Sequence, residues 1–105
     1  MYKITRKSDR NLKHLTEFKD IFEIFTSEDT EKVSINTVEG TGRFDNVEAT
    51  SNFYYFVYQG ELTLEFSDET ITLTEEDAIW IYIGSKYNML GNYKVLMVCE
   101  PAFKD

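Results

Sequence analysis

Apolar and polar residues alternate along much of this chain, most regularly between residues 52 and 91. Residues 52–58 are rich in aromatic side chains and lead to Gly60, and residues 61–66 alternate apolar and polar side chains with a period of two. A polar turn at 67–70 precedes a short apolar segment at 71–73, and a strongly apolar segment at 78–83 ends at Gly84. Short strands at regular spacing, with turn residues between them, predict an all-β sandwich or barrel.

The rest of the chain extends this pattern. Residues 32–38 alternate again and lead to Gly40 and Gly42, where we predict a tight turn, and residues 94–99 indicate a last strand. Residues 43–51 are polar and irregular, as expected at the rim of a barrel. Between residues 11 and 25 a helical spacing of apolar side chains competes with alternation, and we favour a strand at 21–26 after a turn or short helix. We therefore expect one domain, with an N-terminal arm over residues 1–19 and a barrel over residues 20–103.

Length and composition fit one globular domain. The 105 residues suffice for a single core, and 42% of them are hydrophobic. No apolar run approaches the ~20 residues that span a bilayer. The basic start of the chain has no apolar segment behind it, so we expect no signal peptide, no membrane partner and a cytoplasmic location.

The net charge of −8 is unevenly distributed. Residues 1–19 contain six of the eleven basic side chains, so the remainder of the chain is strongly acidic. An acidic surface repels phosphate backbones, and we expect no nucleic-acid partner. The basic arm either lies across an acidic surface, its own or a partner's, or is solvated.

The chain has one cysteine and one histidine, which limits the chemistry that these side chains can perform. Cys99 is the only cysteine, so no disulfide within the chain can form. It belongs to an apolar strand, where a lone thiol is usually a small buried hydrophobic group. A nucleophilic role would need a base, and nothing in the sequence places His14, the only histidine, beside it.

The spacing of Gly60, the acidic turn at 75–77, Gly84 and the 100–103 ending resembles that of the small single-domain cupins over about residues 20–103. The resemblance implies a cupin-type double-stranded β-helix, or jelly-roll barrel. The segments 42–44, 53–55 and 87–91 are also similar to a metal-free variant of these proteins, which implies no particular activity.

The same resemblance identifies where a cupin metal site would lie. In the family, three histidines and one glutamate bind a divalent metal. Counting back from Gly60 places the glutamate on Phe53, and the last histidine falls on Tyr87. The other two histidines fall either on Asn46 and Glu48 or on Val47 and Ala49. Metal sites need several converging nitrogen or oxygen donors, so we expect no metal and no cofactor.

Strand alternation indicates which side chains face the barrel interior. The expected inward residues are Phe53, Tyr55, Val57, Leu62, Leu64, Phe66, Ile79, Ile81, Ile83 and Tyr87. The expected mouth residues are Arg43, Asn46 and Glu48, together with the hydroxyls of Tyr55 and Tyr87. Such an interior either holds a small molecule or is filled by its own side chains. Arg43 either binds a ligand anion or forms an ion pair with Asp45 or Glu48.

These expectations lead to three hypotheses for the function. The first is a metal-free cupin that binds a small organic ligand, such as a sugar, a carboxylate or an aromatic, at Arg43, Asn46, Glu48, Phe53, Tyr55 and Tyr87. The second is an isomerase or lyase, either metal-independent through Tyr87 and Glu48 or with unusual metal ligands. The third is a structural module with a filled barrel. Because the strands at 53–58 and 79–82 are apolar on both faces, we also expect a homodimer that covers the outer face.

Overall fold

The structure is a computed structural model that describes residues 1–104, and almost every element in it is a strand. The elements are a short 3₁₀ turn, Lys7–Asp9, and the strands β1 (Asn11–Thr16), β2 (Lys19–Phe25), β3 (Ser34–Glu48), β4 (Asn52–Glu65), β5 (Thr70–Leu73), β6 (Ala78–Ile81) and β7 (Lys86–Glu100). All neighbours are antiparallel, in the order β1-β2-β3-β7-β4-β5, and β6 also pairs with β4. The all-β prediction is confirmed.

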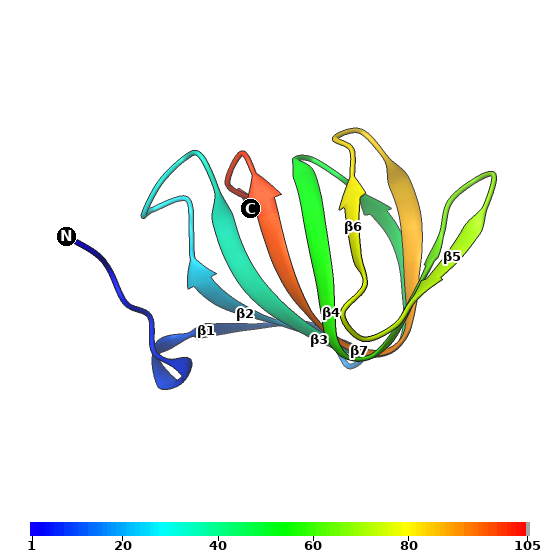
Figure 1. The fold of residues 1–105 in the computed structure, drawn as a ribbon, viewed down its shortest axis with the longest axis horizontal. Helices are drawn as coiled ribbons and strands as arrows, with labels where there is room; N and C mark the ends of the chain where they lie inside the picture. Colours follow the sequence, from blue (N-terminus) through cyan, green and yellow to red (C-terminus); the bar gives the residue numbers. More distant parts are fainter. Residues whose placement is uncertain (105) are drawn as a thin grey trace.

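Three long strands carry the fold, because β3, β4 and β7 each bend and take part in two facing sheets (Figure 1). We define the first sheet as β1, β2 and β6 with residues 34–40, 52–57 and 93–100 of the long strands. The second sheet is β5 with residues 41–48, 59–65 and 86–92. The side chains between the two sheets form the core.

The glycines of the long strands mark bends within strands. The expected strand ends near Gly42 and Gly60 are wrong, because β3 and β4 continue through both residues. Gly60 has φ 83° and Gly91 has φ 128°. A Cβ atom on Gly60 would lie 2.1 Å from the carbonyl oxygen of Asn92 on the adjacent strand. Only glycine tolerates both this conformation and this contact, so the strands can bend here side by side.

Two further expectations about strand limits are corrected. Residues 43–48, expected to be an irregular rim, continue β3, and β7 begins at Lys86 rather than near residue 94. In both places, polar side chains lie on the outer face of the second sheet, where they need no apolar environment. The polar pattern therefore indicated exposure of one face of a strand and not the absence of a strand.

Alternation correctly predicted most of the core. The side chains of Phe53, Tyr55, Val57, Leu62 and Leu64 are all buried, as expected. Ile81 is also buried, and Phe66 and Ile79 pack against the core. The exception is Ile83, which is 57% exposed because β6 ends at Ile81 and the chain turns away after it.

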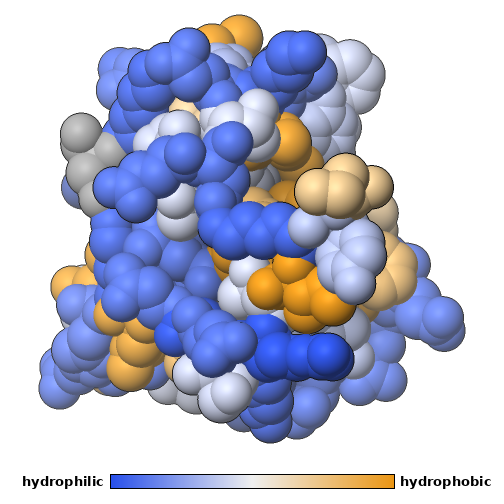
Figure 2. Space-filling model, turned by 90° about the vertical axis from the view of Figure 1, so that its left-hand side faces the viewer, coloured by the Kyte–Doolittle hydropathy of each residue, from blue (hydrophilic) through white to orange (hydrophobic). Residues whose placement is uncertain are grey.

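The N-terminal region is more regular than expected. Residues 11–16, expected to be a turn or short helix, form β1, which pairs with β2 in a hairpin at the edge of the first sheet. Leu12, Leu15 and Phe18, which suggested a helix, are exposed. The face of the molecule on this side is largely hydrophilic, with separate apolar patches between hydrophilic residues (Figure 2). The expected arm of residues 1–19 is thus an arm over residues 1–10 followed by a strand.

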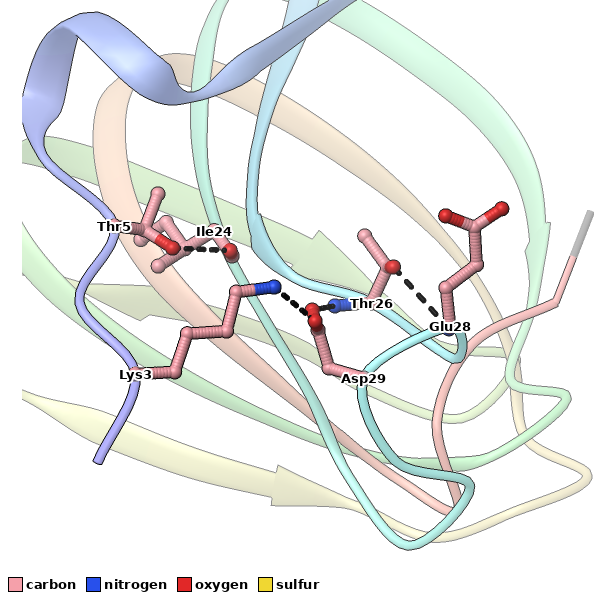
Figure 3. Close-up of polar contacts among 6 residues, drawn as sticks. All are labelled: Lys3, Thr5, Ile24, Thr26, Glu28 and Asp29. Carbon is pink, nitrogen blue, oxygen red and sulfur yellow. Dashed lines mark hydrogen bonds and ion pairs between the residues drawn. The ribbon is translucent and has the colours of Figure 1, made fainter. Parts of the chain in front are cut away.

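The basic arm lies against its own chain (Figure 3). Lys3 forms an ion pair with Asp29 in the turn after β2, and a hydrogen bond from Lys3 lowers the pKa of that carboxyl. The hydroxyl of Thr5 donates to the carbonyl of Ile24 at 3.0 Å. Within residues 1–104, no helix has the length and apolar composition that crossing a bilayer requires.

Candidate functional site

A β-bulge in β3 decides which side chains near the end of this strand face the interior. Phe44 pairs with Met89 and Val47 pairs with Tyr87, so β3 has one residue more than β7 between these pairs. Asn46 within the bulge has φ 61°, a conformation that asparagine tolerates better than most residues. The extra residue shifts the alternation by one position. Before the bulge even-numbered side chains face the core, and after it odd-numbered ones do.

The bulge therefore resolves the two alternatives that the sequence left open. Val47 packs against the core and Ala49 is buried, whereas Asn46 and Glu48 are exposed. Phe53 and Tyr87 complete the interior set. The positions that the resemblance implies for the cupin ligands, where they face the interior, thus hold two aliphatic side chains, a phenyl ring and a phenol.

These side chains do not fit a divalent metal. Three of the four have no donor atom, and a neutral phenol is a poor ligand. Among residues 1–104, no group of three or more His, Cys, Asp or Glu side chains is placed to hold an ion. His14 lies on the exposed β1, where it pairs with Asp20. Cys99 is buried, and its burial raises the pKa of the thiol to about 11.

Two tyrosine hydroxyls meet in the interior. The hydroxyl oxygens of Tyr55 on β4 and Tyr87 on β7 are 2.8 Å apart, and the Tyr55 hydroxyl also contacts the sulfur of Met89 at 3.9 Å. The ring of Phe66 packs on that of Tyr87 with centroids 5.6 Å apart. Burial raises the pKa of both tyrosines above the usual range. Both phenols therefore stay protonated and act as hydrogen-bonding groups rather than bases.

The structure adds one interior residue that sequence reasoning missed, Lys19 at the start of β2. It is 6% exposed, and its ammonium lies 3.4 Å from the sulfur of Met89 and 4.0 Å from the centroid of the Phe44 ring. Burial lowers its pKa to about 8. Lys19 was counted with the basic arm, which was expected either to lie across an acidic surface or to be solvated. Lys19 lies two residues before Ile21, which packs against the core, and this spacing could have indicated an inward side chain. The predicted strand began at residue 21, however, whereas β2 begins two residues earlier.

A hollow at the surface lies beside the core, between β5 and β6. Both strands pair with β4, β5 along residues 62–65 and β6 along residues 53–56. The volume of the hollow is about 390 Å³. Four of its lining side chains also pack in or against the core: Phe66, Ile71, Ile79 and Ile81. The ring of Phe66 also packs on the ring of Tyr87, and the hydroxyl of Tyr87 is paired with that of Tyr55.

The expected mouth residues lie elsewhere, on the outer face of the second sheet. Asn46 and Glu48 line a hollow of about 610 Å³ with Lys86 and Asn88, and three residues of the core or packed against it, Val47, Phe66 and Tyr87, line it too. Tyr87 thus lines this hollow, whereas Phe53 and Tyr55 do not. The structure therefore brings Asn46 and Glu48 to the same hollow as Tyr87, but not together with Phe53 and Tyr55.

Arg43 belongs to the same outer face. Its guanidinium contacts Asp45 at 3.0 Å and Glu65 at 2.5 Å, so the expected ion pair forms with Asp45 but with Glu65 in place of Glu48. The hydrogen bond from Arg43 lowers the pKa of Glu65. Because both carboxylates already occupy the guanidinium, Arg43 is not poised for a ligand anion.

Solved structures with low sequence identity share this arrangement of strands. An RmlC-like cupin from Shewanella frigidimarina NCIMB 400 has a TM-score of 0.82 at 10% identity, over 100% of this chain and 96% of that chain. KdgF from Halomonas sp. has a TM-score of 0.81 at 12% identity, over 96% of each chain. The polyketide cyclase RemF from Streptomyces resistomycificus has a TM-score of 0.80 at 14% identity, over 100% of this chain and 88% of that chain.

No known family profile matches this chain, and neither does any curated protein sequence. At the identities of the solved structures, the similarity is one of fold. Strand order, the bends in β3, β4 and β7, and these superpositions agree with one another. The chain therefore has the jelly-roll fold of the small cupins.

Proposed function

We propose that this protein binds a small organic molecule between its two sheets without the help of a metal. The observation that carries this proposal is a group of polar atoms in the interior: the paired hydroxyls of Tyr55 and Tyr87 and the ammonium of Lys19. The Tyr55 hydroxyl and the ammonium both contact the sulfur of Met89. Ligand pockets are commonly apolar with a few convergent polar groups.

An interior that merely filled space would not need these groups. Burying a hydroxyl or an ammonium costs free energy that a well-packed apolar side chain does not. Met89 is unbranched and flexible, so it can move aside and leave room for a ligand. The hollow between β5 and β6, lined by Phe66 and Ile71, supplies the way in. Among the expected site residues, Phe53, Tyr55 and Tyr87 belong to this site.

The fold relatives are consistent with ligand binding but do not identify a ligand. One of them is a polyketide cyclase, which keeps aromatic and oxygenated molecules among the ligand classes to be screened. The alternative of a metal-independent isomerase or lyase with Tyr87 and Glu48 as a pair has less support, because these side chains point to opposite faces of the second sheet.

A thermal-shift screen with sugars, carboxylates and aromatics tests the proposal. A ligand at 100 times its Kd stabilises the folded state by about 2.7 kcal/mol. Ile71→Trp narrows the hollow between β5 and β6 and should abolish the shift. Thr72→Trp is the matched control, because Thr72 is the neighbouring residue of β5 and faces outward. A shift that survives Ile71→Trp, or the absence of any ligand that shifts the wild type, would contradict the proposal.

We also propose that the outer face of the first sheet pairs with a second copy of this chain. Trp80 stacks on Tyr54 with centroids 5.7 Å apart and meets Tyr82 edge-on at 4.9 Å. Trp80 and Tyr82 are exposed, and Phe56 beside them is 39% exposed. Aromatic side chains of this kind are enriched at the centres of interfaces between subunits.

Sedimentation analysis of Trp80→Glu tests this pairing. We expect the wild type to be dimeric and the variant to be monomeric with its fold intact. Phe18→Glu, in the turn between β1 and β2 and 45% exposed, changes an apolar surface residue outside the strands of this sheet and should remain dimeric. A monomeric wild type at micromolar concentration would contradict the pairing.

A further inference from the structure

Lys19 lacks a negative partner although its ammonium is buried. Among residues 1–104, no carboxylate forms an ion pair with it, and its contacts are the sulfur of Met89 and the ring of Phe44. An ammonium has three N–H donors, whereas a thioether is a weak acceptor and a phenyl ring has no lone pair. A desolvated cation–π contact contributes about 2 kcal/mol, which is less than the several kcal/mol that burial of an ion costs.

The surrounding side chains do not supply the missing charge. The titratable groups that face the interior are Tyr55 on β4 and Tyr87, Tyr93 and Cys99 on β7. Burial raises the pKa of each, to about 12 for Tyr93 and about 11 for Cys99, so all are neutral near pH 7. Among the side chains of residues 1–104, the interior therefore has one positive charge and several hydroxyl donors, and no negative charge.

The placement of these groups suits an anionic oxygen. The sulfur of Met89 touches both the Lys19 ammonium and the Tyr55 hydroxyl, so an atom that replaced this sulfur would reach both donors. Tyr93 lies over Gly40, the residue that pairs with Lys19, and a Cβ atom on Gly40 would be 2.4 Å from the Tyr93 hydroxyl. Gly40 thus lets another phenol lie on the strand beside Lys19.

We infer that the molecule bound between the sheets is a small organic anion, and that its carboxylate or phenolate oxygen contacts the ammonium of Lys19. This inference rests on the proposed function, since it names the chemical class of the ligand at the same site. Movement of the Met89 side chain makes room for the ligand oxygen. The hydroxyl of Tyr55 then donates a second hydrogen bond to that oxygen.

The inference also gives a pH dependence. An anion binds to the charged form of Lys19, whose pKa in the free protein is about 8. Affinity for a carboxylate should therefore be constant below that pH and fall as the pH rises above it. A neutral ligand of the same shape should show no such fall.

Binding of charged and neutral probes, followed by protein NMR shifts, tests the inference. The probes are benzoate against benzamide, and 4-nitrophenol against 4-nitroanisole. We expect the wild type to prefer benzoate over benzamide by about tenfold or more, which corresponds to about 1.4 kcal/mol. Binding should also increase the visible absorbance of the nitrophenolate form. The two pairs distinguish a carboxylate from a phenolate ligand.

Lys19→Met should remove this preference while neutral probes still bind. Lys94→Met is the matched control, because Lys94 lies on β7 with its ammonium paired to Glu39 at 3.0 Å, and it should keep the preference. If Lys19→Met does not fold, the inference is tested instead on the wild type, whose affinity for benzoate should fall above pH 8. Equal affinity for charged and neutral probes would overturn the inference and leave the proposed function standing. Failure of all four probes to bind between the sheets would count against both.

Discussion

The hydroxyl of Tyr55 lies 2.8 Å from the hydroxyl of Tyr87, although 32 residues separate them in the chain. Tyr55 extends from the first sheet and Tyr87 from the second. Their hydrogen bond therefore joins the two sheets across the interior. The phenol of Tyr87, at the position where the resemblance implies a ligand histidine, finds its partner in another side chain.

The stability lost by removing these hydroxyls one at a time should add up to more than the stability lost by removing both together. Tyr55→Phe leaves the buried hydroxyl of Tyr87 without its partner, at a cost of about 1–3 kcal/mol. The double variant with Tyr87→Phe leaves no such hydroxyl, so its loss should be smaller than the sum of the two single losses. Urea unfolding of the four proteins measures this coupling. Strict additivity would show that the hydroxyls do not interact.

Two substitutions of aliphatic side chains by alanine test which residues face the interior and which face outward. Leu64 is fully buried, and Leu64→Ala should lower the free energy of unfolding by about 2–5 kcal/mol. Ile83 was predicted to face the interior but is 57% exposed, so Ile83→Ala should change stability by no more than about 0.5 kcal/mol. Similar losses for the two variants would contradict the assignment of faces.

The bends in the long strands are tested by two glycines with similar backbones. Gly60 has φ 83° and Gly84 has φ 93°, but only a side chain at Gly60 would meet the neighbouring strand. Gly84→Ala should cost about 1–2 kcal/mol from conformation alone. Gly60→Ala should cost clearly more, because its Cβ would lie 2.1 Å from the oxygen of Asn92. Thermal unfolding of both variants gives the comparison, and equal losses would mean that the close approach at the bend is unimportant.

Strand alternation in the sequence was sufficient to predict the fold class and most of the core. On β4 and β7 the pattern of large apolar residues is strong, and it placed Phe53, Tyr55, Leu64 and Tyr87 correctly. The glycines were read as strand ends because a glycine in a turn and a glycine in a bent strand look alike in a sequence. Which of the two applies depends on the neighbouring strand, as the contact between Gly60 and Asn92 shows.

The candidate site was harder to predict, for two physical reasons. The bulge at Asn46 reverses which side chains of β3 face inward, and nothing local in the sequence required one extra residue there. Glu48 was therefore expected beside Tyr87 and lies on the opposite face. Lys19 was missed because a lysine in a basic segment is usually solvated, and only the pairing of β2 with β3 turns its side chain inward.

The buried charge of Lys19 should make stability depend on pH. Its folded pKa is about 8, below the unfolded value of 10.5, so the folded protein binds fewer protons between these values. Stability from this group therefore rises as the pH rises from about 8 to 10.5, and the full penalty, roughly 3 kcal/mol, is present below pH 8.

Comparison with Lys19→Met isolates this effect. The buried tyrosines and Cys99 have raised pKa values and act in the opposite direction at high pH, but they are present in both proteins. We expect Lys19→Met to be the more stable protein at pH 7 and its advantage to shrink by pH 10. A pH-independent difference in the free energy of unfolding would contradict a buried Lys19.

Metal content is the most direct test of a jelly roll that works without a metal. The protein would be purified without chelators or a metal-affinity tag, incubated with excess iron, manganese, nickel and zinc salts, desalted, and measured by plasma mass spectrometry. Because Val47, Ala49 and Phe53 provide no donor atoms and Tyr87 is bound to Tyr55, we expect far less than one ion per chain. One tightly held ion per chain, retained after desalting, would contradict the central claim.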